Sequence, residues 1–193
     1  MITEYHFPTM IYIKDFPDSE KLNKYLEDHI MRWSQNDKGV SKTNAGGWHS
    51  STDMNQKEEY NPLTRELFNM QEEIYQKENL SRKPVCGNMW ANINYPGCYN
   101  RPHIHPNSLF SGVYFVKTPQ NSGNLMLYDP RPGVQMTMPN RKEGKLSPEL
   151  WREVHYEPKA GRCIMFPSWL WHEVKPNKSN DTRISVSFNF LQK

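Results

Sequence analysis

Three histidines have the types and spacing from which a metal site could be built. His103 and His105 lie two residues apart in the stretch NRPHIHPN, and His172 follows late in the chain in WLWHEVKP. Residues two apart on a β-strand point to the same face, so both imidazoles could bind one cation. Three neutral imidazoles suit iron, zinc or copper and leave coordination positions for a substrate. The pairing alone is equally typical of loop histidines at a surface.

Arg183 and Ser185 form a second polar pair, in the stretch RISVSFNF. Strict alternation predicts a strand that carries Arg183, Ser185, Ser187 and Asn189 on one face and apolar side chains on the other. A guanidinium with a hydroxyl two residues away can hold a carboxylate through a bidentate ion pair and one hydrogen bond. The alternative is an arginine on the solvated face of a sheet.

Two further residues are weaker candidates. Trp171, next to His172, could wall a pocket, although tryptophan in a β-sandwich is more often part of the core. Arg131, in DPR, could meet an anionic substrate or simply pair with an acidic neighbour.

The elements that must position these residues differ between the two parts of the chain. Residues 1–84 read as a helical support region, with helices expected over 18–33 and 62–80 from apolar spacings of three and four, and a polar loop between them. Residues 85–193 read as short β-branched and aromatic runs separated by Pro, Gly, Asn and Asp. Six or seven strands without intervening helices predict antiparallel sheets in a sandwich or jelly roll.

Composition limits the class of protein. A length of 193 residues fits a single domain, and 24 Lys and Arg against 21 Asp and Glu are interspersed, which argues against a duplex nucleic acid partner. Neither a signal peptide nor an apolar run long enough for a membrane span is recognisable, so a cytoplasmic location without a membrane partner is expected. The three cysteines show no disulfide or zinc-ribbon spacing.

Several blocks together resemble a known family. The motifs HIHPNS, SGVYFV, DPR, FPSWLWHEVKPN and RISVSFN occur in this order from about Asn88 to Asn189. They are similar to the 2-oxoglutarate- and iron(II)-dependent oxygenases, in particular to a branch found in bacteria and phages. The resemblance implies a double-stranded β-helix, with Fe(II), 2-oxoglutarate and O2 as cofactors and cosubstrates. A phage-encoded member would act in the cytoplasm of its bacterial host.

The resemblance also implies roles for individual residues. His172 would be the distal iron ligand, and Arg183 with Ser185 would bind the far carboxylate of 2-oxoglutarate. An N-x-Y stretch precedes the ligand pair in some related oxygenases, so Asn94 or Tyr114 could hydrogen-bond the cosubstrate, although Asn92 and Asn94 could also simply alternate outward on a strand. His103 or His105 would be the first ligand. The wider superfamily has HxD or HxE at this place, whereas this chain has His103-Ile104-His105.

Three explanations of this departure remain. His105 could stand in the carboxylate position, giving a triad of His103, His105 and His172, which is the version we favour. Alternatively, His105 is the sole first ligand and Asn107 faces the metal. In the third explanation a distant carboxylate completes the ligand set, with Asp129 as the best candidate.

The expected activity is hydroxylation of an unidentified substrate, a small molecule or a protein side chain, coupled to conversion of 2-oxoglutarate to succinate and CO2. One alternative is a cupin-like metal enzyme that does not use 2-oxoglutarate, which would leave Arg183 and Ser185 without a purpose. The other is a non-catalytic binding or structural protein on the same fold. A homodimer is conceivable, because strand edges and helices could pair.

Overall fold

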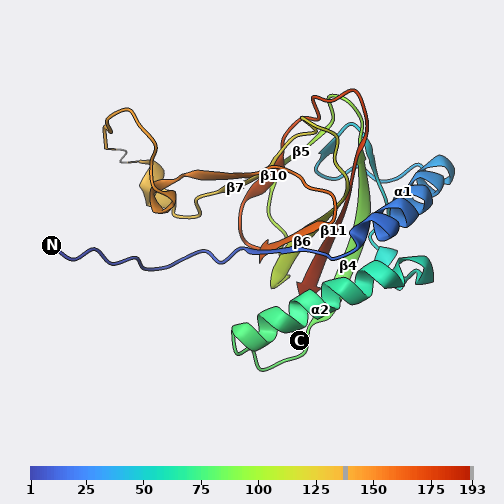
Figure 1. The fold of residues 1–193 in the computed structure, drawn as a ribbon, viewed down its shortest axis with the longest axis horizontal. Helices are drawn as coiled ribbons and strands as arrows, with labels where there is room; N and C mark the ends of the chain where they lie inside the picture. The colour runs from blue at the N-terminus through green and yellow to red at the C-terminus, as the bar shows by residue number, and fades with distance from the viewer. Residues whose placement is uncertain (137–138, 192–193) are drawn as a thin grey trace.

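The computed structural model describes residues 1–136 and 139–191. Two α-helices, α1 (Ser19–Asn36) and α2 (Asn61–Lys77), precede most of the β-structure (Figure 1). The strands are β1 (Tyr12–Asp15), β2 (Asn44–Ala45), β3 (Trp48–His49), β4 (Val85–Asn94), β5 (Tyr99–His103), β6 (Phe110–Lys117), β7 (Leu125–Tyr128), β8 (Glu153–Tyr156), β9 (Arg162–Pro167), β10 (His172–Val174) and β11 (Arg183–Leu191). Short 3-10 helices are η1 (Met54–Gln56), η2 (Glu58–Tyr60), η3 (Pro132–Gln135) and η4 (Pro148–Leu150).

The strands form two antiparallel sheets that face each other. The larger sheet has the order β1-β9-β6-β11-β4-β3, and the smaller has the order β2-β5-β10-β7-β8. From β4 to β7 and again from β8 to β11, consecutive strands alternate between the sheets, as in a double-stranded β-helix, whereas β7 and β8 pair with each other in the smaller sheet. The fold class expected from the sequence is confirmed.

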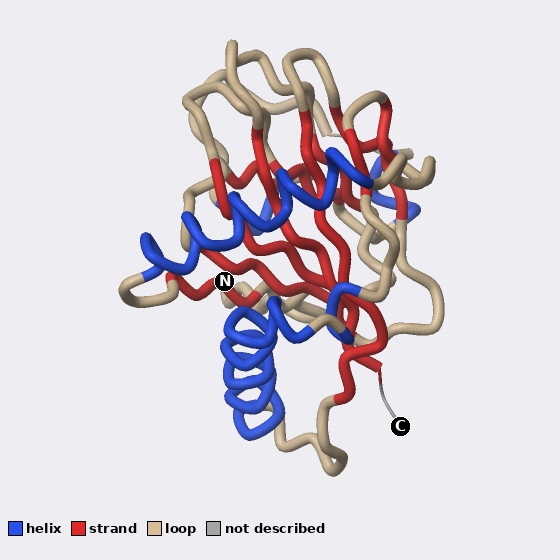
Figure 2. The backbone as a smooth tube through the Cα atoms, turned by 90° about the vertical axis from the view of Figure 1, so that its right-hand side faces the viewer, coloured by secondary structure: helices blue, strands red, loops and turns tan. Residues whose placement is uncertain are grey.

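The helices cover the outer face of the larger sheet (Figure 2). In this view α1 lies across the strands and α2 is seen nearly end-on. Leu26 and Ile30 of α1 and Leu63 and Leu67 of α2 are fully buried in the core between helices and sheet. Their spacing of four residues is one of the two from which the helices were expected, because such residues line one helical face.

A second, smaller core lies between the two sheets. It contains Val113 and Phe115 of β6, Ile164 and Phe166 of β9, and Leu125 and Leu127 of β7. Both faces of the larger sheet are thus buried, one against helices and the other against the smaller sheet. This explains why β6 reads as an almost continuous apolar run.

Several short elements were not expected from the sequence. The segment between the two helices, interpreted as a loop, contains β2, β3, η1 and η2. β1 and β5 were also missed, and β5 includes Pro102, a residue usually found at strand edges or ends. β5 nevertheless pairs with β10 and β2 in the smaller sheet, so tertiary pairing outweighs the local sequence preference.

No helix within residues 1–136 and 139–191 combines the length and the apolar character that a membrane crossing requires.

Candidate metal centre

The three histidines meet between the two sheets. His103 lies at the end of β5 and His172 at the start of β10, and the two residues are directly paired in register. His105 follows β5, where its backbone N–H donates to the Ser168 carbonyl at 2.9 Å. One ring nitrogen from each histidine lies within 4.8 Å of the others, so the three side chains are arranged to share one cation.

Hydrogen bonds fix which nitrogen of each ring is available. Nδ1 of His103 lies 2.6 Å from the Arg101 carbonyl, and Nδ1 of His172 lies 2.9 Å from the Leu170 carbonyl. Nδ1 of His105 lies 2.6 Å from Oδ1 of Asn189. Because all three partners are acceptors, each Nδ1 carries the proton and each Nε2 keeps a free lone pair. This is the tautomer that a metal-binding histidine needs when its other nitrogen is held by a hydrogen bond.

Burial keeps the three rings neutral. Desolvation lowers the pKa of His103 to about 4, with a smaller contribution in the same direction from nearby His105. It also lowers the pKa of His105 and holds that of His172 well below its usual value. Neutral imidazoles are the ligating form, so no proton has to be displaced near pH 7.

The cavity beside the histidines has a volume of about 40 Å³. Apolar side chains of both sheets and polar side chains of β4 and β11 line it: Thr43, Trp90, Asn92, Asn100, His103, His105, Gly112, Val113, Phe115, Leu125, Phe166, His172, Val174, Ser185 and Ser187. The lining contains no acidic residue. Trp90 stands between His49 and His105, with ring centroids 5.6 and 5.5 Å away.

Arg183 lies on the inner face of β11, and its side chain is completely buried. Nη1 donates to the Ser122 carbonyl, to the Gly123 carbonyl at 3.1 Å and to the Lys175 carbonyl at 3.3 Å. Nε and Nη2 are also buried and have no hydrogen-bond partner. Burial lowers the pKa of this guanidinium to about 10, so it remains charged at neutral pH. A buried cation with two unused donors calls for an anion, and a carboxylate has the matching two-oxygen geometry.

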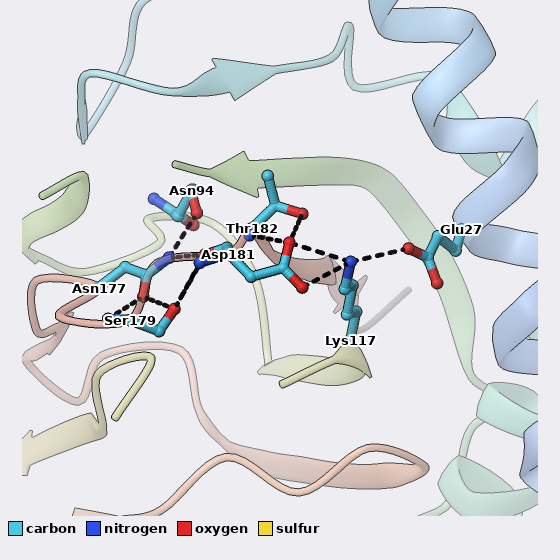
Figure 3. A network of polar contacts seen from close by, with 7 residues as sticks. All are labelled: Glu27, Asn94, Lys117, Asn177, Ser179, Asp181 and Thr182. Carbon is cyan, nitrogen blue, oxygen red and sulfur yellow. Dashed lines mark hydrogen bonds and ion pairs between the residues drawn. The ribbon is translucent and has the colours of Figure 1, made fainter. Parts of the chain in front are cut away.

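A polar network fixes the chain just before Arg183 (Figure 3). Nδ2 of Asn177 donates to the Asn94 carbonyl at 2.9 Å and to the Asp181 carbonyl at 2.7 Å, which ties the β10–β11 connection to β4. Lys117 pairs with Asp181 at 3.0 Å and with Glu27 of α1 at 3.1 Å. The start of β11 is therefore held by both the larger sheet and a helix.

Ser185 lies on the strand face of Arg183 that the alternation predicts, and Asn94 lies beside Arg183 on the neighbouring strand. Ser185 lines the cavity, and Asn94 is the register partner of Arg183 on β4. Oδ1 of Asn94 and Oδ1 of Asn92 are buried and without a hydrogen-bond partner. These orphaned atoms and those of Arg183 lie on the inner side of the same two strands, which fits a polar ligand bound there.

Tyr114 does not lie at the site, contrary to the prediction that it could hydrogen-bond the cosubstrate. It points to the opposite face of β6 from Val113 and Phe115, stacks on Phe16 with a centroid distance of 5.2 Å, and donates to Oδ1 of Asn23 in α1 at 2.6 Å. The period of two along the strand sends it to the helix-covered face. Tyr114 is therefore a core residue and cannot reach a ligand between the sheets.

Trp171 and Arg131 also lie outside the histidine cavity. Trp171 is half-exposed and does not line it, because His172, its neighbour on extended chain, takes the inward direction. Arg131 forms an ion pair with Asp129 at 2.8 Å and borders a separate cavity of about 510 Å³ beside the N-terminal segment. Trp171 therefore does not wall the histidine cavity, and Arg131 shows the alternative that the sequence left open, an ion pair with an acidic neighbour.

Asn107 and Asp129 were the alternative metal ligands, considered because this chain has HxH where the superfamily has HxD or HxE. Neither lies at the histidine cluster. Asn107 is exposed and occupies a turn with φ of 65°, beyond the cluster. The Asp129 carboxylate is engaged by Arg131 and by Arg152, the latter at 3.7 Å, and Arg131 lowers the pKa of this carboxyl. In the described part of the chain, the metal-ligating side chains that converge here are three histidines without a carboxylate.

Asn189, Trp90 and Phe166 are site residues that the sequence did not single out for a role. Asn189 contacts His105 directly, and Phe166 packs its ring 4.7 Å from that of His172. The alternation in RISVSFNF does place Asn189 on the same face as Arg183, which is the one signal that could have found it.

Fold and site together define, within the described part of the chain, a double-stranded β-helix protein with a partly buried cluster of three histidines without a carboxylate and a buried arginine. A family described as "Putative 2OG-Fe(II) oxygenase" matches residues 88–189, more than half of the chain, and the protein belongs to this family. It is therefore an Fe(II)- and 2-oxoglutarate-dependent oxygenase. No curated protein matches the sequence.

Solved structures share the fold over nearly the whole chain. A Pseudomonas putida prolyl-4-hydroxylase is 18% identical, with a TM-score of 0.68, and the match covers 96% of this chain and 94% of that one. The viral collagen prolyl hydroxylase from Paramecium Bursaria Chlorella virus-1 is 15% identical, with coverage of 93% and 94% and a TM-score of 0.62. The 2-oxoglutarate-dependent epimerase SnoN from nogalamycin biosynthesis is 12% identical, with coverage of 95% and 77% and a TM-score of 0.69.

Proposed function

We propose that the protein hydroxylates a small molecule or a protein side chain, with iron bound through Nε2 of His103, His105 and His172. The observation that carries the proposal is the shared hydrogen-bond pattern of the three rings. Each Nδ1 donates to an oxygen outside the cluster, so three Nε2 lone pairs are available to one metal. Histidines in a surface loop are not expected to share both the same tautomer and the same direction of their Nε2 atoms.

Arg183, with Ser185 beside it, would bind the outer carboxylate of 2-oxoglutarate. Nε and Nη2 of Arg183 are buried without partners, and such donors are costly unless a ligand accepts from them. A histidine cluster that could hold a metal and a buried cation suited to a carboxylate thus lie in one interior, and a metal enzyme independent of 2-oxoglutarate would not require the second of these.

When bound, iron and 2-oxoglutarate supply the oxidising chemistry, in which one oxygen atom of O2 enters the substrate and the other enters succinate as CO2 leaves. The residues of the chain hold and orient these groups. Phe115, Val113 and Phe166 form an apolar wall that keeps water out. In such a dry environment the attraction between Arg183 and a carboxylate is stronger than in water.

Anaerobic titration of the metal-free protein with Fe(II) and 2-oxoglutarate tests this function. We expect a weak visible charge-transfer band that requires both additions. The band should vanish in His105→Ala and need at least tenfold more 2-oxoglutarate in Arg183→Met. Arg131→Met removes the same charge outside the cavity and serves as the control, with an unchanged titration.

A band that survives in His105→Ala would refute the three-histidine ligand set. A 2-oxoglutarate affinity that Arg183→Met leaves unchanged would refute the carboxylate site. Once the band is established, consumption of 2-oxoglutarate in the presence of candidate small molecules and peptides identifies the substrate.

A further inference from the structure

A row of polar side chains crosses the larger sheet beneath His105. Asn88 of β4, Asn189 of β11 and Ser111 of β6 are direct register partners on three adjacent strands. Asn189 and Ser111 are buried, with exposed fractions of 6% and 0%. Amides and hydroxyls are rarely buried in the middle of an apolar sheet unless hydrogen bonds compensate them.

The hydrogen bonds of this row fix the orientation of the Asn189 amide. Nδ2 of Asn189 donates to Oδ1 of Asn88 at 2.7 Å, and Oδ1 of Asn189 accepts from Oγ of Ser111 at 2.7 Å. Ser111 Oγ in turn lies 2.9 Å from Oγ of Ser168. Rotating the amide by half a turn would place Oδ1 of Asn189 against Oδ1 of Asn88, acceptor against acceptor, so the hydrogen bonds of the row favour the orientation in which Oδ1 faces His105.

His105 therefore differs from the other two histidines in how its tautomer is set. Backbone carbonyls hold Nδ1 of His103 and His172, whereas the side chain of Asn189 holds Nδ1 of His105 at 2.6 Å. A backbone carbonyl cannot be removed by mutation, but the acceptor for His105 can. His105 is also the histidine that stands where related oxygenases are expected to have a carboxylate.

We infer that Asn189 is a positioning residue for the metal site, which orients His105 and keeps its Nε2 unprotonated. This inference rests on the proposed function, because it takes His105 to be a ligand. Partners that hold the second nitrogen of a metal-binding histidine commonly change metal affinity by 10–100-fold.

Two measurements on the whole protein test the inference. In the metal-free protein at pH 7.5, nitrogen NMR of ¹⁵N-histidine should show the Nδ1–H tautomer for His105 in the wild type. Asn189→Leu, which has a similar shape but no acceptor, should lose this preference at His105 only. Co(II) titration against a competing chelator should show binding at least tenfold weaker in Asn189→Leu.

Asn189→Asp keeps an oxygen acceptor. Its Co(II) affinity should be no more than about threefold weaker than that of the wild type. Gln71→Leu is the matched control: it also replaces a fully buried amide by leucine, but on α2, where Nε2 and Oε1 of Gln71 have no partners. Its Co(II) affinity should equal that of the wild type.

The outcomes separate this inference from the proposed function. If His105→Ala weakens Co(II) binding but Asn189→Leu retains both the tautomer and the affinity, the positioning role is wrong and the ligand set stands. If His105→Ala binds Co(II) like the wild type, the proposed ligand set fails. If Asn189→Leu does not fold, Asn189→Asp tests the inference in its place. A loss of Co(II) affinity as large as that of His105→Ala would overturn the inference, and retained Co(II) affinity would support it.

Discussion

The charge balance of the site follows from individual residues. Three neutral imidazoles leave a divalent cation with its full charge, and Arg183 adds a further positive charge in the same interior. The cavity lining contributes no carboxylate to offset them. A dianion such as 2-oxoglutarate neutralises much of this charge, so metal and cosubstrate should each raise the affinity of the protein for the other, and by the same factor.

Replacing His105 by a carboxylate tests this coupling. His105→Asp lowers the charge of the ligand set by one, so metal binding without 2-oxoglutarate should become tighter relative to binding with it. We expect the ratio of the two Co(II) dissociation constants, without and with saturating 2-oxoglutarate, to fall by about tenfold, the size of a partly screened single-charge interaction. Isothermal titration calorimetry measures both constants.

His155→Asp makes the same substitution at an exposed position of β8 and should leave the ratio unchanged. An equal ratio in wild type and His105→Asp would mean that direct contacts, not the net charge of the site, couple the two ligands.

At the scale of elements, Arg183 depends on a turn between β6 and β7. The Ser122 and Gly123 carbonyls accept from its Nη1, and Gly123 has φ of 91°, a conformation that favours glycine. A Cβ added at Gly123 would lie 2.1 Å from the Lys175 carbonyl oxygen, which is itself a partner of Arg183. The turn and the β10–β11 connection are thus packed together around the guanidinium.

Gly123→Ala should therefore affect both stability and cosubstrate binding. We expect the free energy of unfolding to fall by roughly 1–3 kcal/mol, from backbone strain and the forced separation of the two segments. The dissociation constant for 2-oxoglutarate should rise, because the carbonyls that orient Arg183 move. Urea denaturation and calorimetry give the two quantities.

Gly133→Ala is the matched control, since a Cβ at Gly133 has no atom within 4 Å. Wild-type stability in Gly123→Ala would show that the turn relaxes without cost and that its carbonyls are not a rigid support.

At the scale of the whole molecule, burying the histidines makes stability depend on pH. The pKa of His103 in the folded protein is about 4, below its usual 6.5, and those of His105 and His172 are also lowered. Below about pH 6.5 these histidines bind protons in the unfolded chain but stay largely neutral in the folded chain. The free energy of unfolding of the metal-free protein must therefore fall as pH drops from about 6.5 towards 4.

Urea denaturation at pH 7.5, 6 and 5 measures this loss. Each buried histidine can contribute up to about 1.4 kcal/mol per pH unit within the window. His103→Leu should show a shallower decline, because one of the three groups is removed. A decline as steep as that of the wild type would assign the acid sensitivity to other residues.

Much of this protein could be predicted from local patterns. Spacings of three and four identified both helices, and alternation placed Arg183, Ser185 and Asn189 on one face of β11, because these periods follow from backbone geometry alone. The HxH spacing likewise predicted that His103 and His105 could share a ligand. The family resemblance then joined them to His172, which no local period could do.

Tertiary structure alone decided the direction of side chains in strands that are buried on both faces. β6 has no polar and apolar alternation to show that Val113 and Phe115 face the site and Tyr114 faces α1. The choice among His105, Asn107 and Asp129 also depended on contacts made over long sequence separations, such as that of Asp129 with Arg152 and that of His105 with Asn189. Sequence periodicity specifies which side chains share a face, whereas only the packing of the sheets and helices specifies what that face contacts.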